Sequence, residues 1–245
     1  MKASGNKILI TGGATGIGFG LAERFVSEGN TVIVCSRRQP ALQEAMNKLP
    51  QLITHQFDLA SVRDREELFR WITDEHPDVN VLINNAGIQN WMNLTDDNFY
   101  ERAKEEIAIN IDAPLHLTSL FIKHKALTTL INISSGLSFV PLIKTPVYSA
   151  TKAFIHSLTL SIRELLKEKK IEVIEIIPPA LNTDLGGKGL HDFAPPVKEF
   201  IEAIFKQLNE GRKELTFGFT EALNNAGAEV LKSTFQKMNQ LPESK

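Results

Sequence analysis

The residue types that the sequence lacks, or has few of, already exclude several classes of protein. Among its 245 residues there is one cysteine, Cys35, which excludes an internal disulfide and a metal cluster built from several thiolates. Six histidines are scattered without the spacing of metal ligands, so we expect no metal site. Basic and acidic residues nearly balance, at 27 against 29, and this balance argues against nucleic acid or an anionic membrane as a partner.

Long apolar runs are also missing. No stretch approaches the roughly 20 residues that a membrane helix needs, and the segment MKASGNKILITGG does not have the pattern of a signal peptide. We therefore expect a cytoplasmic protein. Because no linker rich in Pro, Gly or Ser and no internal repeat divides the chain, we expect a single domain over residues 1–245.

Short β-branched runs alternate with longer helical patterns along the chain. The predicted strands are Lys7–Thr11, Thr31–Ser36, Leu52–Phe57, Val79–Asn84, Thr129–Ser134 and Ile171–Ile177. The predicted helices are Gly18–Glu28, Pro40–Leu49, Val62–Glu75, Asp96–Lys123 and Ser149–Lys169. This alternation predicts an α/β fold: a Rossmann-like, doubly wound parallel sheet with helices on both faces.

The regularity ends after Pro178, in a loop rich in Gly and Pro. Long loops inside compact domains are usually functional, so we interpret residues 184–197 as a substrate lid. A helix near Pro196–Asn209 and a strand near Glu214–Phe219 follow, and residues 220–245 are expected to form a C-terminal helical tail.

A glycine-rich turn follows the first predicted strand and leads directly into a helix. Glycines let a backbone approach a pyrophosphate closely, and the amide-rich start of a helix attracts its charge. The strand–turn–helix context favours a dinucleotide site over an ordinary structural turn. The predicted contacts are Gly12, Thr15, Gly16, Ile17 and Gly18.

Tyr148 and Lys152 are spaced one helical turn apart at the start of a predicted helix. Reduction of a carbonyl by hydride transfer leaves an alkoxide, which needs a proton donor beside it. A lysine at this spacing can stabilise a phenolate and bring the pKa of a tyrosine toward the working pH. The alternative is a surface Tyr and Lys that share a helix face by chance.

The end of the second strand indicates which coenzyme would bind. An acidic residue there would accept a hydrogen bond from the ribose 2′-hydroxyl of NAD. Ser36 occupies that position, and Arg37 and Arg38 follow it. Because guanidinium groups match phosphate geometry, NADP(H) is favoured over NAD(H), against the alternative of a solvated arginine pair.

Five features occur along the chain in an order that resembles the short-chain dehydrogenase/reductase family in its single-domain branch. They are TGGATGIG, the Asn84–Gly87 sequence NNAG, Ser135, Tyr148-x-x-x-Lys152 and Pro178. The stretches NVLINNAGIQ, PVYSATKA and EVIEIIPPALNT are similar to the oxidoreductases encoded with the D-alanine–teichoic acid operon, the DltE-like group. The resemblance implies a homodimer or homotetramer that acts on a small-molecule carbonyl or alcohol.

The resemblance also implies two further catalytic residues. Ser135 would orient the substrate, with Ser134 as the adjacent candidate. Asn110 would hold a water that links Lys152 to solvent. The alternative for Asn110 is a hydrogen-bonded structural amide beside the helix disturbance that Pro114 introduces.

Further coenzyme contacts follow from the resemblance. Asp58 and Leu59 would contact the adenine, although Asp58 could instead be the N-cap of the next helix. Asn85, Ala86 and Gly87 would lie against the adenine ribose, with a partly structural role. Pro178 and Thr183 would lie near the nicotinamide, where Pro179 replaces the usual glycine of the family and stiffens the backbone.

Together these features predict an NADP(H)-dependent oxidoreductase with catalytic residues Ser135, Tyr148, Lys152 and Asn110. Two alternatives remain open at this point: a catalytically silent regulatory protein that binds NAD(P), and a fold-related epimerase or dehydratase. The substrate cleft is expected between the segments 89–93, 137–143 and 185–193, and it is expected to be mostly apolar.

Overall fold

A computed structural model describes residues 1–240 of the chain. Seven strands form one parallel sheet in the order β3-β2-β1-β4-β5-β6-β7. The strands are β1 (Lys7–Thr11), β2 (Thr31–Ser36), β3 (Ile53–Gln56), β4 (Val81–Asn84), β5 (Thr129–Ile133), β6 (Glu172–Ile177) and β7 (Glu214–Thr216). The predicted doubly wound α/β fold is confirmed.

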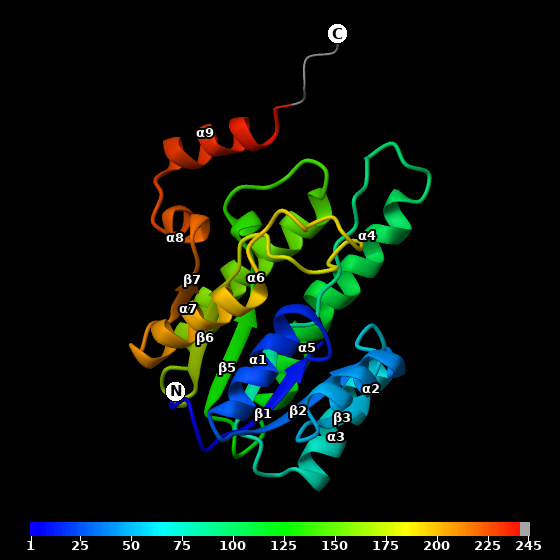
Figure 1. Ribbon diagram of the computed structural model, residues 1–245, viewed down its shortest axis with the longest axis vertical. Helices are drawn as coiled ribbons and strands as arrows, with labels where there is room; N and C mark the ends of the chain where they lie inside the picture. The colour runs from blue at the N-terminus through cyan, green and yellow to red at the C-terminus, as the bar shows by residue number, and fades with distance from the viewer. Residues whose placement is uncertain (241–245) are drawn as a thin grey trace.

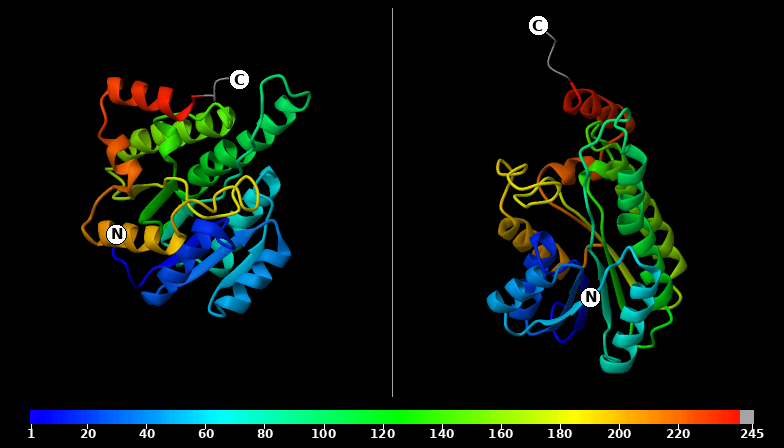
Figure 2. Two further views of the ribbon diagram at one scale, coloured as in Figure 1. Left: turned by 45° about the horizontal axis from the view of Figure 1, so that its top comes forward. Right: turned by 90° about the vertical axis from the view of Figure 1, so that its right-hand side faces the viewer.

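Helices cover both faces of the sheet, as Figures 1 and 2 show. On one face lie α1 (Gly16–Ser27), α2 (Gln39–Lys48) and α7 (Val197–Asn209). On the other lie α3 (Val62–Glu75), α4 (Phe99–Ile107), α5 (Ala113–Phe121) and α6 (Pro146–Leu165). The C-terminal helices α8 (Phe219–Asn224) and α9 (Ala228–Met238) lie beyond the end of β7.

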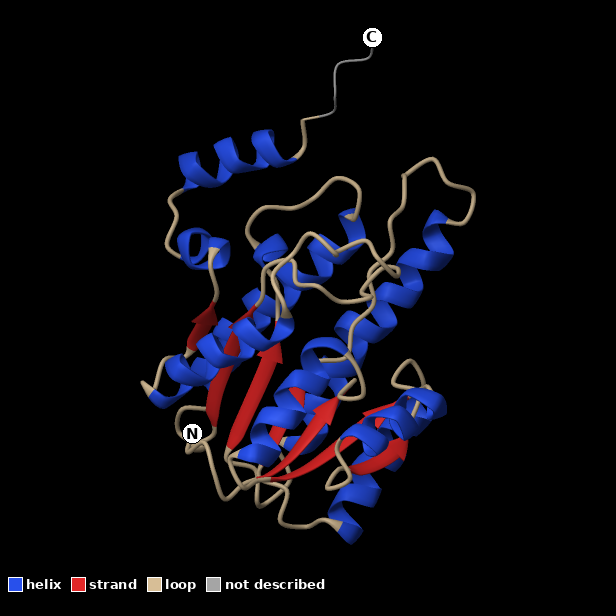
Figure 3. Ribbon diagram, in the orientation of Figure 1, coloured by secondary structure: helices blue, strands red, loops and turns tan. Residues whose placement is uncertain are grey.

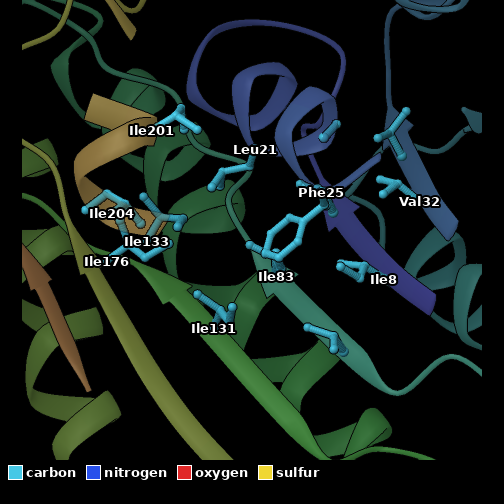
Figure 4. Close-up of a cluster of buried hydrophobic side chains, with 14 of the residues drawn as sticks. Ile8, Leu21, Phe25, Val32, Ile83, Ile131, Ile133, Ile176, Ile201 and Ile204 are labelled. Atoms are coloured by element: carbon cyan, nitrogen blue, oxygen red, sulfur yellow. The ribbon is translucent and has the colours of Figure 1, made fainter. Parts of the chain in front are cut away.

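The strands read as continuous apolar runs because both of their faces are buried. Between the sheet and α1, Leu21 and Phe25 pack in one cluster with Ile8 and Ile83 (Figure 4). A second cluster lies between the opposite face and helices α3 and α5. The two apolar layers hold the strand ends in fixed positions relative to the helices.

One predicted helix, Asp96–Lys123, is wrong as a single element. It consists of α4, a π-helical turn (η1, Ala108–Asp112) and α5. Pro114 has no N–H to donate to the carbonyl oxygen of Asn110, so the regular ladder breaks there. In the π-helical turn the N–H of Ala113 donates instead to the carbonyl of Ala108. Such turns occur frequently at functional sites.

Other boundaries shift by a few residues. Helix α6 starts at Pro146. Proline is favoured in a first turn because a backbone N–H there would have no acceptor within the helix, so its absence costs no hydrogen bond. Strand β7 ends at Thr216, so the predicted strand to Phe219 is too long. The predicted tail from 220 contains α9 and most of α8, and its residues 241–245 lie outside the described part of the chain.

The chain reverses its direction of winding at β1, which pairs with β2 on one side and β4 on the other. Open α/β sheets bind ligands beyond the carboxyl ends of the strands at such a point. In Figure 3 the long loops gather on the side toward which the strand arrows point. Most of the predicted site residues belong to these loops and to the helix starts beside them, whereas Asn110 lies in the π-helical turn.

Candidate active site

The glycine loop connects the end of β1 to the start of α1. Gly12 and Gly16 have φ angles of +66° and +55°, a conformation that costs glycine nothing. A Cβ atom added at Gly18 would lie 2.5 Å from the carbonyl oxygen of Gly12. The spacing of these glycines therefore reflects both a tight turn and a close approach of helix to loop.

Within residues 1–240, no side chain caps the N-terminus of α1. Thr15 is the N-cap residue, its side chain makes no capping hydrogen bond, and both Thr15 and Gly16 are exposed. Ile17 packs its side chain against the core and thus offers only its backbone amide. The first amides of a helix carry partial positive charge, so a pyrophosphate fits this end.

Asn85 ties the end of β4 to the glycine loop. Its Nδ2 atom donates to the carbonyl oxygens of Thr11 and Gly12, at 2.9 and 3.2 Å. The backbone N–H groups of Asn85 and Ala86 donate to Thr11 Oγ1, at 3.0 and 3.1 Å. These two residues therefore have the structural role that the sequence suggested in part.

Two exposed arginines follow the end of β2. Ser36 Oγ accepts from the backbone N–H of Arg38, at 3.3 Å, and the side chain of Gln56 donates to the carbonyl oxygen of Arg37, at 2.9 Å. Both arginine side chains are exposed at the start of α2. The backbone here is held in place while the guanidinium groups are accessible to a phosphate.

Asp58 is not the N-cap of the following helix, so that alternative is wrong. Helix α3 is capped by Ser61, whose hydroxyl accepts from the N–H of Asp64 at 3.2 Å. Asp58 is exposed, and its Oδ1 accepts from the N–H of Ala60 at 3.0 Å. The side chain of Leu59 is buried in the apolar cluster beneath.

Tyr148 and Lys152 share one face of the first turns of α6. Both side chains are buried, and Lys152 Nζ lies 5.6 Å from the centroid of the Tyr148 ring. Lys152 Nζ also donates to the carbonyl oxygen of Ile133, at the end of β5, at 2.8 Å. The structure thus brings the two residues together at the carboxyl end of the sheet.

Ser135 joins them from the loop after β5. Its hydroxyl accepts from the N–H of Leu137 at 3.1 Å and lies near enough to Tyr148 to lower the pKa of that phenol. The hydroxyl of Ser134 is buried and has no partner among the described residues. Of the two adjacent serines, Ser135 is the one that contacts the tyrosine.

Asn110 lies in the π-helical turn and holds the loop after β4. Its Oδ1 accepts from the N–H of Ile88, and its Nδ2 donates to the carbonyl of Ile88 and to Thr151 Oγ1. A Cβ at Gly87 would lie 3.4 Å from Asn110 Oδ1 and 3.7 Å from Lys152 Nζ. Asn110 is therefore a hydrogen-bonded amide that also holds this loop close to Lys152.

Burial changes the acidity of the central pair. It raises the pKa of the Tyr148 phenol, and the nearby Ser135 hydroxyl acts in the opposite direction. It lowers the pKa of the Lys152 ammonium to about 8. Because burial has the larger effect on Tyr148, the polypeptide alone does not lower the pKa of this phenol as the Tyr–Lys spacing predicts.

Pro178 and Thr183 belong to the loop that follows β6. The carbonyl of Pro178 accepts from the N–H of Gly136 at 3.0 Å, which joins the loops after β5 and β6. Thr183 lies beside the start of α1, since a Cβ at Gly16 would be 3.6 Å from its methyl group. Thr183 is thus placed next to the end of α1 that fits a pyrophosphate.

The predicted lid contains no helix or strand before α7 starts at Val197. A Cβ at Gly186 would lie 3.0 Å from Gln89 Oε1 and 3.3 Å from Trp91 Nε1, so this loop rests on the segment after β4. Asn182 and Pro196 pair at its base. The predicted lid thus lies next to the segment 89–93, one of the three expected to line the substrate cleft.

One buried acid beside this group, Glu106, was not predicted. It precedes Asn110 by one helical turn, in the sequence EEIAIN, and therefore belongs on the same helix face. That spacing is the signal that could have identified it. Among residues 1–240, no helix combines the length and apolar character needed to cross a membrane, and no group of His, Cys, Asp or Glu could hold a metal ion.

Known proteins resemble this chain over most of its length. A family model described as short chain dehydrogenase matches residues 6–192. An oxidoreductase of Bacillus subtilis, DltE, which is itself uncharacterised, is 39% identical over 98% of both chains. Both resemblances stated from the sequence motifs are confirmed.

Solved structures share the fold. A short chain dehydrogenase from Burkholderia cenocepacia in complex with NADP has a TM-score of 0.84, with 22% identity over 98% of this chain and 100% of the other. A short chain dehydrogenase/reductase from Burkholderia phymatum in complex with NAD has a TM-score of 0.78, with 16% identity over 100% of this chain and 99% of the other.

Proposed function

Because the chain belongs to the short-chain dehydrogenase family, we propose that it is an NADP(H)-dependent oxidoreductase that interconverts a carbonyl and an alcohol, with Tyr148 as general acid and base. The observation that carries this proposal is the convergence of Ser135, Tyr148 and Lys152 at the carboxyl end of the sheet, beside a helix start that fits a pyrophosphate.

The glycine loop and the start of α1 would hold the coenzyme pyrophosphate, and Asp58 would accept from the adenine amine. The bound nicotinamide supplies or accepts the hydride. Arg37 and Arg38 would pair with a 2′-phosphate, which favours NADP(H) over NAD(H). The fold neighbours include complexes with either coenzyme, so the arginines carry this part of the proposal.

The polypeptide supplies the proton. In the reduction direction the hydroxyls of Ser135 and Tyr148 would both donate to the carbonyl oxygen, and Tyr148 would transfer its proton to the alkoxide. Lys152 stabilises the resulting phenolate by its charge. Asn110, through Ile88, keeps the loop of Gly87 close to Lys152, which we propose as its contribution together with a water held nearby.

The substrate side combines apolar walls with a few unpaired polar atoms. Trp91 and Phe193 are exposed there, while Gln89 Oε1, Ser138 Oγ and both ring nitrogens of His191 are buried without partners among the described residues. Buried polar atoms usually have partners. We therefore propose a largely apolar carbonyl compound with one or two polar groups as the substrate.

Exposed apolar side chains support self-association through the helices that carry Asn110 and Tyr148. We propose a homodimer or homotetramer that buries this surface, and a cytoplasmic location. The side chains concerned are Ile107, Leu115, Phe154, Leu160 and Leu165.

The proposal is tested by screening carbonyl compounds for loss of the NADPH absorbance. Tyr148→Phe should lower turnover by about 100- to 10,000-fold, the usual contribution of a general acid, and leave NADPH affinity unchanged. Tyr100→Phe, at an exposed tyrosine of α4, is the matched control and should keep full activity. Comparable rates in Tyr148→Phe and the parent would reject the role of Tyr148, and NADPH binding without turnover of any compound would favour a silent regulatory protein.

A further inference from the structure

Glu106 lies in the last turns of α4 and is completely buried, with a side-chain exposure of 0%. Its Oε1 accepts from the backbone N–H of Asn90, while its Oε2 is buried and has no partner among residues 1–240. One backbone donor compensates only part of the solvation that an ionised carboxylate loses on burial. A charge at this position is therefore costly.

The groups that face Glu106 come from three segments. On α4 itself, Arg102 lies one turn earlier, and its positive charge favours the carboxylate. The guanidinium of Arg102, however, donates to the carbonyl oxygen of Trp91, at 2.9 Å. The segment 88–91 contributes only neutral residues. From α6 come Tyr148 and Lys152: Asn110, one turn after Glu106 on the same helix face, donates to Thr151 Oγ1, which lies between these two residues, and the charge of Glu106 acts on Tyr148.

Glu106 and Tyr148 oppose one another electrostatically. A negative charge on Glu106 raises the pKa of Tyr148, because two anions are unfavourable in one buried region. Burial raises the pKa of Glu106 itself to about 7. The carboxyl thus changes its charge within the range in which an enzyme of neutral pH works, and its two forms differ in their effect on the phenol.

We propose that Glu106 is a positioning residue for Tyr148: it holds the segment 88–91 through Asn90, and its carboxylate, which forms only at a cost in this buried position, opposes ionisation of the phenol. The inference rests on the acid–base role proposed for Tyr148. Asn110 and Glu106 then hold the same segment from successive turns, at Ile88 and Asn90.

The chain offers a direct test because it has two tyrosines, Tyr100 and Tyr148. In a Tyr100→Phe background, the ultraviolet absorbance of tyrosinate reports Tyr148 alone and requires no substrate. Glu106→Gln retains an oxygen that can accept from Asn90 and removes the charge. The titration midpoint of Tyr148 should then move to lower pH. An unchanged midpoint would overturn the proposal.

Glu105→Gln is the matched control, since it removes the same charge from the adjacent, exposed position of the same helix. It should leave the midpoint of Tyr148 unchanged, and equal shifts in both variants would reduce the effect to general surface charge and overturn the local role. If Glu106→Gln does not fold, the parent labelled with ¹³C at glutamate carboxyls provides the test. One carboxyl should titrate near 7 rather than near the ordinary 4.5, and the absence of such a resonance would contradict the proposal.

Once a substrate is known, the pH profile of kcat for alcohol oxidation gives a second readout. This direction needs the phenolate, so the rise in kcat with pH should occur at lower pH in Glu106→Gln than in the parent and Glu105→Gln. Failure of the two proposals can be told apart. Turnover that depends on Tyr148 with no shift of its titration rejects only the role of Glu106, whereas a shift without turnover rejects only the proposed function.

Discussion

Arg37 and Arg38 illustrate how single residues would select the coenzyme. The backbone around them is fixed by Ser36 and Gln56, while their side chains extend into solvent. Because this backbone is already fixed, it loses little further conformational freedom when either guanidinium pairs with a phosphate. Hydrogen bonds to charged groups contribute about 1.5–3 kcal/mol each, which is enough to separate two coenzymes that differ by one phosphate.

We predict that Arg37→Ala weakens NADPH binding by about 10- to 100-fold and leaves NADH binding nearly unchanged. Titration of both coenzymes by fluorescence measures this. Arg70→Ala, at an exposed arginine of α3, is the control for loss of one positive charge. An equal loss of affinity for both coenzymes would exclude recognition of the 2′-phosphate by Arg37.

At the residue scale, sequence spacing predicted which side chains pair in the site, but it did not predict which of them are buried. Tyr148 and Lys152 could be paired because a helix places residues one turn apart on one face. The spacing could not show that burial would raise the pKa of Tyr148, since that depends on segments distant in the chain. Glu106 was missed because an acid in a charged helical segment is expected to be solvated, and only its spacing of one turn from Asn110 indicates a buried position.

At the scale of elements, helix α1 is the one whose start would hold the coenzyme pyrophosphate. Both of its ends are marked by a glycine with positive φ: Gly16 at +55° where it starts and Gly29 at +83° just after it ends. Neither position would place a new Cβ in a clash, because the nearest atom to Gly16 is at 3.6 Å and nothing lies within 4 Å of Gly29. Alanine at either glycine is therefore strained only through its backbone.

We predict that Gly16→Ala and Gly29→Ala each destabilise the protein by about 1–2 kcal/mol, the cost of a left-handed conformation. Only Gly16→Ala should weaken NADPH binding, because its amide belongs to the helix end that would hold the pyrophosphate. Chemical denaturation and coenzyme titration give the two quantities. Equal effects of both substitutions on coenzyme affinity would show that this helix end does not bind the phosphates.

Elements with a strong apolar pattern were predictable, and the interrupted helix was not. The strands were predicted to within two residues at nearly every end because burial on both faces imposes continuous apolar runs. Pro114 indicated a disturbance in the helix 96–123. The form of this disturbance, a π-helical turn, depends on the hydrogen bond from Ala113 to Ala108 and on the contacts of Asn110. No local sequence pattern encodes these contacts.

At the scale of the whole molecule, a half-buried histidine on helix α6 pairs with a buried glutamate of the sheet. Glu175 of β6 is fully buried, and both its oxygens lie 3.0 Å from Nδ1 of His156. The hydrogen bond with Glu175 raises the pKa of His156 above 6.5. A raised pKa means that this pair stabilises the fold fully below the unfolded value of the imidazole, and that the stabilisation is lost as pH rises through the folded value.

We predict that the melting temperature of the parent falls as pH rises above about 6.5, and that His156→Gln removes much of this dependence. The glutamine amide can still donate to Glu175 but does not titrate. His55→Gln, at an exposed position of β3, is the control. Thermal melts across this pH range measure the effect, and an identical slope in parent and His156→Gln would contradict it. Glu106 acts in the same direction at lower pH, between 4.5 and about 7, and Glu106→Gln separates the two.

Hydride transfer assisted by the phenol of Tyr148 is the central step of the proposed reaction. The most direct measurement uses NADPH with deuterium at both C4 positions, a carbonyl substrate found in the screen, and mass spectrometry of the alcohol in a single turnover. The parent should transfer deuterium to the carbonyl carbon, and Tyr148→Phe should bind the same coenzyme with equal affinity and transfer it at least about 100-fold more slowly. Transfer at comparable rates in the two proteins, or an alcohol without deuterium from the parent, would contradict the account.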